Sequence, residues 1–348
     1  MSQNIHSNPK LYIAGALIPT CQGASISFPG QSQVSKFTAQ IADPDIEEAS
    51  LFGKEVVYYL NYGGGDSVPI FRGYITQVSG SETSVSITAM DVRGYLTLDF
   101  RKIELTDKNN YDGFTLGQFL KYYIDTFINK EKIYIGTDLI NDTNPAASLS
   151  KMRGTFKVYD LVVNILQNTL DEQDDNEPLD YTLNVINEVD NSSLVFNKKK
   201  KLTAIPSMSL SRTDGIIKLS YKERPRKYVA SLKDREFVYG SNPTGPFNIP
   251  ISEATDKDKK LTPEELREIA RKKILKEFNN NIEISIQASK GHYINVGDMV
   301  QLNVQESILL GSHRITSKKI QVKSGGVDLS FTLNKEPIKL SEYIDIGI

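Results

Sequence analysis

The sequence predicts an α+β protein that is mainly β, with two β-barrel-like domains, a small α/β insertion and one helix-containing segment. Three observations support this fold class. Residues 11–100 alternate apolar and polar side chains with the period of a strand, the period becomes helical within 106–200, and strand patterns return after about 206. The chain has 348 residues, of which 39% are hydrophobic and 24% charged, which is typical of a soluble protein with about two or three domains.

The first β-domain is predicted over residues 1–104. One of its strands shows a regular period of two, and its apolar positions are Val85, Ile87 and Ala89. Apolar and aromatic runs at 56–62 and 68–78 flank the glycine-rich turn at 63–66, a pattern that predicts a β-hairpin. We expect strands from about 206–238 to complete this domain.

An α/β insertion domain with two helices is predicted over residues 105–205. Its first helix has one apolar stripe, formed by Leu116, Phe119, Leu120, Tyr123, Ile124 and Phe127. Thr115 and Gln118 have the spacing of a capping box at the start of that helix. The second stripe consists of Val158, Leu161, Val162, Ile165 and Leu166. Short strands are then predicted around 181–186 and 194–197.

Residues 239–348 are predicted to hold a helix and the second β-domain. Short strands precede this part at 207–210, 216–219 and 227–232. A polar loop is expected over 240–260 and a helix over 262–279, because Thr262 suits the N-cap and Pro263 the first helical position. The alternating strands that follow contain Ile282, Ile284 and Ile286, then Val300, Leu302 and Val304, then Val327, Leu329, Phe331 and Leu333.

The two β regions repeat one order of features. The first comprises Gly53–Val56, Phe71–Thr76 and Ser84–Thr88, and the last comprises Gly297–Val300, Leu310–Thr316 and Val327–Thr332. Each runs from a turn glycine through a strand, a loop, a glycine-containing strand with Ile-Thr, and an alternating strand. Two interpretations stay open: antiparallel meanders resemble one another in general, or one barrel-like domain occurs twice.

Signals for enzymatic chemistry are poor. His6, His292 and His313 are far apart and form no metal-binding motif, so we interpret them as structural or solvated residues. The lone Cys21 excludes an internal disulfide and has no neighbouring His or basic cluster that would activate it. We predict no catalytic, cofactor-binding or metal-binding residues and no cofactors.

Three further segments have a structural interpretation and a functional alternative. Gly63–Gly65 suits a hairpin turn rather than a phosphate loop, because no Lys-Ser/Thr pair and no helix follow it. The acidic residues within 171–177 indicate a solvated loop rather than a calcium site. Lys198–Lys201 is typical of a charged strand edge, with contact to DNA or a neighbouring subunit as the alternative.

Charge and hydropathy limit the partners. A net charge of -2 argues against broad electrostatic binding of nucleic acid. No apolar run approaches the ~18 residues that span a bilayer. The polar Met1–Lys10 lacks the apolar core of a secretory signal, so we expect folding in a cytoplasm.

A series of short motifs runs along nearly the whole chain. The N-terminal motifs are Leu11–Gly15, Phe37–Asp43, Phe71–Ile75 and Ser86–Asp91, followed by the helical stripe within Phe156–Leu170. The C-terminal motifs are Asn295–Val300, Gly311–Thr316 and the final alternating strand. In this order they resemble the baseplate hub proteins of contractile phage tails, a family often labelled phage late control D. His313 departs from the family pattern, which commonly has Tyr there.

The resemblance implies a homotrimer that forms a ring around a channel. Each subunit would carry two tube-like β-domains, so three chains would present six units to the sixfold tail tube protein and a threefold platform to the spike. The chain stops at Ile348 without β-helical repeats, so the resemblance implies a separate central spike protein, besides other baseplate proteins. DNA would only pass through the channel. The expected location is the tail baseplate of the virion, after assembly in the host bacterial cytoplasm.

The leading hypothesis is therefore a structural virion protein and not an enzyme: a trimeric baseplate hub that connects tail tube and spike. Two alternatives remain at this point. One is a tail-tip protein of a long flexible-tailed phage, and the other is a tail-associated cell-wall hydrolase.

Overall fold

The computed structural model divides the chain into two compact units. Unit 1 comprises residues 1–200, 288–297 and 316–330, and unit 2 comprises 201–287, 298–315 and 331–348. The residues that the structure describes are 9–19, 21–29, 33–42, 48–60, 69–97, 102–105, 114–129, 135–141, 154–162, 170–171, 177–178, 181–188, 190–198, 205–223, 228–232, 235–239, 247–250, 282–306, 309–323 and 326–334.

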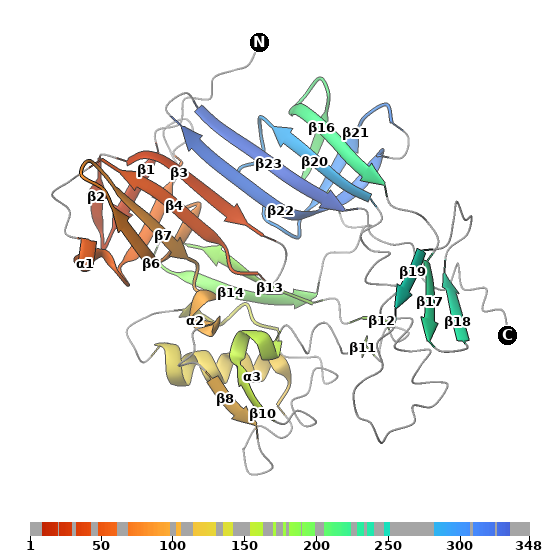
Figure 1. Cartoon of the computed structure of the whole chain (residues 1–348), viewed down its shortest axis with the longest axis horizontal. Coiled ribbons are helices and arrows are strands. Elements are labelled where there is room, and N and C mark those ends of the chain that lie inside the picture. The colour runs from red at the N-terminus through yellow and green to blue at the C-terminus, as the bar shows by residue number, and fades with distance from the viewer. Residues whose placement is uncertain are drawn as a thin grey trace. The chain divides into compact units, whose positions relative to one another are not determined.

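Unit 1 is built on an antiparallel sheet with the strand order β22-β3-β4-β7-β6-β5-β1-β2 (Figure 1). Its strands are β1 (Lys10–Ile13), β2 (Ala16–Ile18), β3 (Cys21–Phe28), β4 (Lys36–Ile41), β5 (Glu55–Tyr59), β6 (Phe71–Gly80), β7 (Val85–Met90) and the second half of β22 (Gly311–Lys323). Two short helices, α1 (Glu48–Leu51) and α2 (Gly94–Thr97), follow β4 and β7. The hairpin expected from 56–62 and 68–78 is confirmed as the β5–β6 pair.

The core of this sheet follows the predicted alternation. Val85, Ile87 and Ala89 are buried on β7, and β4 buries every second residue in the same way. Three aromatic rings meet in this core: Phe37 stacks on Phe71 at 5.3 Å between ring centroids and lies 5.1 Å from Tyr58. Alternation therefore correctly identified the face that packs inward.

Gly73 allows β6 to approach β7 closely. A Cβ atom at this position would lie 2.1 Å from the backbone oxygen of Met90. Replacing Gly73 by Ala should therefore force the strands apart and lower the free energy of unfolding by about 1–3 kcal/mol. Urea unfolding tests this, with Gly94→Ala as control, because the nearest atom there is a side-chain Cβ at 3.1 Å. Equal losses in both variants would contradict the close-approach argument.

The insertion in unit 1 packs two helical segments against short strands. Its elements are β8 (Lys102–Leu105), α3 (Leu116–Tyr123), the π-helical turn η2 (Ile124–Ile128), β9 (Ile135–Gly136), β10 (Gly154–Lys157), β11 (Leu170–Asp171), β12 (Glu177–Pro178), β13 (Tyr181–Asn187) and β14 (Ser192–Lys198). The predicted capping box is confirmed: the Gln118 N–H donates to Thr115 Oγ1 at 3.2 Å, and the Thr115 N–H donates to Gln118 Oε1 at 3.1 Å. Residues 158–162 are helical as expected, and the rest of the second stripe lies outside the described residues.

One part of the predicted apolar stripe is wrong. Leu116 through Ile124 are buried at the expected positions, but Phe127 is 42% exposed and Ile128 is buried instead. The cause is η2, because a π-turn adds a residue to the helical repeat and rotates the following side chains. Phe127 consequently points to the surface, where its ring lies 6.2 Å from that of Tyr122.

Unit 2 contains a second set of strands. These are β15 (Met208–Ser211), β16 (Ile216–Glu223), β20 (Ile282–Ala288), β21 (Met299–Asn303), the first part of β22 and the end of β23 (Gly326–Asn334). A separate three-stranded sheet is formed by β17 (Tyr228–Leu232), β18 (Arg235–Tyr239) and β19 (Phe247–Pro250). The predicted strands after residue 206 are confirmed.

The pairing of these strands corrects two expectations. Strands from 206–238 do not complete the first β region: β15 pairs with β21, β16 lies beside β20, and β17 and β18 pair with each other. The expected loop 240–260 contains β19, which pairs in parallel with β17. Both differences arise from backbone pairing between distant segments, which local patterns do not encode.

The helix expected at 262–279 lies outside the described residues, and the domain boundaries stay a prediction.

Candidate functional site

The strongest candidate feature is an antiparallel strand pair that occurs in both units with the same register and that is called the repeated meander below. In unit 1, β5 pairs with β6 through Glu55↔Tyr74, Val56↔Gly73, Val57↔Arg72 and Tyr58↔Phe71. In unit 2, β21 pairs with β22 through Met299↔Arg314, Val300↔His313, Gln301↔Ser312 and Leu302↔Gly311. When residues are counted from Gly53 and Gly297 in the first strand and from Ile75 and Ile315 in the second, all four pairs correspond. A shift of one residue would have turned every side chain to the other face, so the shared register is specific.

The turn before each meander also repeats. Gly53 and Gly297 both adopt positive φ angles, of 75° and 97°, which glycine reaches without steric cost. In unit 1 the N–H of Ile75 donates to the Lys54 oxygen at 3.0 Å, and in unit 2 the N–H of Ile315 donates to the Asp298 oxygen at 2.9 Å. These bonds join equivalent positions. The similarity predicted from the sequence therefore extends to backbone conformation and hydrogen bonding.

Both sets of paired strands end in an open edge within the described part of the chain. In unit 1 the order ends at β2, and in unit 2 it ends at β16. An edge strand carries backbone N–H and C=O groups that a further strand can pair with. On β16, Ile217 is 63% exposed and Tyr221 is 48% exposed, and both fall on the same face because they are four residues apart.

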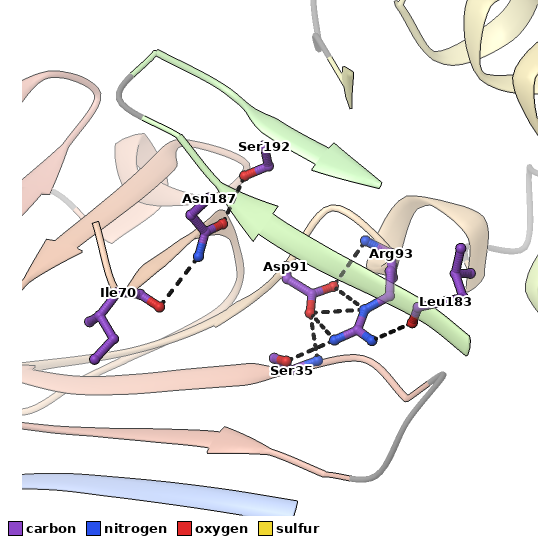
Figure 2. Close-up of polar contacts among 7 residues, drawn as sticks. All are labelled: Ser35, Ile70, Asp91, Arg93, Leu183, Asn187 and Ser192. Carbon is purple, nitrogen blue, oxygen red and sulfur yellow. Dashed lines mark hydrogen bonds and ion pairs between the residues drawn. The ribbon is translucent and has the colours of Figure 1, made fainter. Parts of the chain in front are cut away.

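A buried ion pair connects the sheet of unit 1 to the insertion (Figure 2). The Arg93 guanidinium donates from Nη2 to Asp91 Oδ2 at 2.6 Å and to Ser35 Oγ at 2.8 Å, and from Nη1 to the Leu183 backbone oxygen on β13 at 2.9 Å. The Ser35 N–H donates to Asp91 Oδ2 at 2.8 Å. Both charged side chains are buried, so their hydrogen bonds replace those that water would make.

Tyr159 interacts electrostatically with this pair. Burial raises the pKa of its hydroxyl to about 12, while Arg93 acts to lower the pKa and Asp91 to raise it. The phenol therefore stays neutral at physiological pH and does not supply a second negative charge to Arg93. The junction is an ion pair of one acid and one base, suited to holding two parts of the unit together.

The other end of the β13–β14 hairpin is held by two further contacts. Asn187 Nδ2 donates to the Ile70 oxygen at 3.3 Å, and within the hairpin the Ser192 hydroxyl donates to Asn187 Oδ1 at 2.9 Å, as Figure 2 shows. Arg72 Nη1 donates to Glu55 Oε1 at 2.8 Å and to the Asp190 oxygen at 3.2 Å. The hairpin is therefore fixed to the sheet at three points along its length.

The residues considered for chemistry do not come together. His292 and His313 are buried in different units, and His6 lies outside the described residues. Burial raises the pKa of the Cys21 thiol, which disfavours the thiolate. The turn at 63–66 and most of the acidic and lysine runs also lie outside the described residues.

The described ranges contain no group of three or more His, Cys, Asp or Glu side chains arranged to hold a metal ion. Within them, no helix combines the length and apolarity needed to cross a bilayer.

The burial of five charged residues was not predicted from the sequence. They are Arg72, Asp91, Arg93, Arg314 and Lys318. Charged residues are exposed by default, so their burial depends on partners that are distant in the chain. The local signal was slight: Asp91 and Arg93 directly follow an alternating strand.

Comparison with known proteins gives structural matches only. No family model and no curated protein sequence matches the chain. It is similar in structure to a tail protein from Neisseria meningitidis MC58, with 13% identity, a TM-score of 0.61 and coverage of 94% of this chain and 96% of that one. It is similar to the same degree to the 43 kDa tail protein of prophage MuSo2 from Shewanella oneidensis, with 13% identity, a TM-score of 0.61 and coverage of 94% and 97%.

A third match comes from a secretion system. An Escherichia coli component of the type VI secretion system, itself structurally similar to the T4 bacteriophage tail proteins gp27 and gp5, matches with 11% identity and a TM-score of 0.58. The match covers 94% of this chain and 79% of that one. At these identities the likeness establishes the fold, which is the mainly β fold of phage-type tail proteins.

Proposed function

We propose that this chain is a structural component of a phage-type tail: a trimeric hub that joins a sixfold tail tube to a threefold central spike, without catalysis. The observation that carries the proposal is the repeated meander, with equal register and an equivalent hydrogen bond in both units. A chain with two copies of one module offers six similar modules when three chains assemble. A closed trimer with two modules in each chain can therefore contact a sixfold partner on one side and a threefold partner on the other.

The open strand edges support assembly. Exposed edges favour pairing with another chain unless they are protected, and β16 is eight residues long with exposed apolar side chains. Pairing between subunits would continue the sheets around a channel. The tube-like β-barrels predicted from the sequence would then be completed by neighbouring chains.

The buried junction supports a rigid subunit. The insertion is joined to the sheet by Arg93, Asn187 and Arg72, at three points along one hairpin. A hub between two partners needs a fixed relation between the parts that contact them. The similarity to tail proteins and to a type VI secretion component agrees with this role.

Size-exclusion chromatography with light scattering tests the assembly. We expect a mass of about three times 38.9 kDa. A monomer that persists at high protein concentration would contradict the trimeric hub.

An assay on peptidoglycan tests the non-enzymatic part of the proposal. We expect no turnover above buffer. Turnover that a single Asp or Glu substitution abolishes would instead favour a tail-associated hydrolase.

A further inference from the structure

A buried lysine, Lys318, donates hydrogen bonds to the backbone of the loop that contains His292 and Ile294. Lys318 on β22 donates from Nζ to the His292 oxygen at 3.1 Å and to the Ile294 oxygen at 2.7 Å. The ammonium also lies 4.5 Å from the centre of the Phe28 ring on β3. One side chain thus fixes the backbone on both sides of Tyr293.

Of three consecutive side chains in the loop, the first and last are buried and the middle one is exposed. His292 and Ile294 are buried, whereas Tyr293 between them is 78% exposed. The bonds to Lys318 and the two buried neighbours restrain the backbone that carries Tyr293. Its phenol is therefore presented to solvent from a fixed position, which lowers the entropy lost in any contact it makes.

The imidazole of His292 is placed where a proton would be unfavourable. The Lys318 ammonium acts electrostatically on this ring. Protonation would place a second positive charge in the same buried site, where water screens poorly. Exposing the ring would relieve this repulsion, and it would also move the two carbonyl groups away from Lys318, because one of them belongs to His292 itself.

We propose that residues 289–298 form a proton-sensitive loop, in which protonation of His292 releases the loop from Lys318 and ends the fixed display of Tyr293. The loop closes when His292 is neutral and opens when the ring takes up a proton. This coupling does not depend on the proposed role as a hub, because it rests on the contacts of Lys318 with His292 and Ile294, all of which belong to unit 1.

The direction of the pH effect follows from the two protonation equilibria. Burial, and then the Lys318 charge, lower the pKa of His292 from 6.5 to about 4. The open loop therefore binds the proton more tightly than the closed loop between these values. The free energy that favours the closed loop over the open loop is largest above about pH 6.5, and it decreases as the pH falls toward 4. From pH 7.5 to pH 5 the opening equilibrium should rise about 20- to 30-fold.

Two measurements on the full-length chain test the proposal. Proton NMR follows the titration of the three histidines, each assigned by its His→Gln variant. Hydrogen exchange, corrected for the intrinsic effect of pH, follows the opening of residues 289–298. We expect His292 to titrate near pH 4, and loop protection to fall 20- to 30-fold by pH 5.

Variants separate the coupling from general acid unfolding. His292→Gln cannot take up the proton, so its loop protection should not change with pH. Lys318→Met should raise the pKa of His292 and open the loop already at neutral pH, whereas Lys319→Met, at the exposed neighbouring position, should change neither. A His292 pKa near 6.5, or a loop that opens with pH equally in His292→Gln, would overturn the proposal.

Discussion

Replacing Arg93 by Met should lower the free energy of unfolding by about 3–5 kcal/mol. The substitution removes the guanidinium but leaves the Asp91 carboxylate buried, with Ser35 and backbone N–H groups as its remaining partners. It also removes the donor to the Leu183 oxygen on β13, so the β13–β14 hairpin loses one of its three attachments to the sheet. Urea unfolding, with hydrogen exchange at β13, measures both effects.

An exposed ion pair provides the control for Arg93→Met. Lys323 Nζ lies 2.9 Å from Asp328 Oδ2, and both side chains are largely exposed. Lys323→Met should cost at most about 1 kcal/mol. The double variant Asp91→Asn/Arg93→Met should recover part of the loss, because no unpaired buried charge remains. Losses of equal size for Arg93→Met and Lys323→Met would contradict a structural role for the buried pair.

Placing two carboxylates on β16 should separate the proposed trimer into single chains. The variant is Ile217→Asp/Tyr221→Asp, which converts the exposed apolar face of this edge strand into a charged one. Unpaired carboxylates at a subunit interface cost several kcal/mol, so association should weaken by well over tenfold. Light scattering measures the mass, and circular dichroism should show that the fold is unchanged.

The opposite face of β16 supplies the matched control. Lys218 and Ser220 are exposed and polar, so we expect them to remain in water after assembly. The variant Lys218→Asp/Ser220→Asp should keep the mass of three chains. If both double variants separate the trimer, the added negative charge weakens association irrespective of the face that carries it. If neither variant separates the trimer, the face with Ile217 and Tyr221 is not part of the interface.

Local patterns in the sequence predicted most of the strands and one helix start. The alternation at Val85, Ile87 and Ala89 identified the buried face, because a strand exposes opposite sides in turn. Thr115 and Gln118 identified the beginning of α3, because their side chains complete the first turn locally. Phe127 was misplaced, since the pattern of a regular helix does not include the extra residue of a π-turn.

The tertiary arrangement was predicted less well for a physical reason. Arg93 and the Leu183 oxygen are 90 residues apart in the chain, and Lys318 reaches back 24 residues to Ile294. Such contacts depend on the packed fold, so local composition showed neither the burial of the Asp91–Arg93 pair nor that of Lys318. The repeated meander was visible as an order of motifs, but its equal register became evident only from the strand pairs.

Electron microscopy of the purified assembly tests the central claim most directly, namely that three chains with two copies of one module imitate sixfold symmetry. Averaged end-on views should show six similar β modules around a central channel on one side and threefold symmetry on the other. A ring in which each chain contributes one module, or particles without rotational symmetry, would contradict the account.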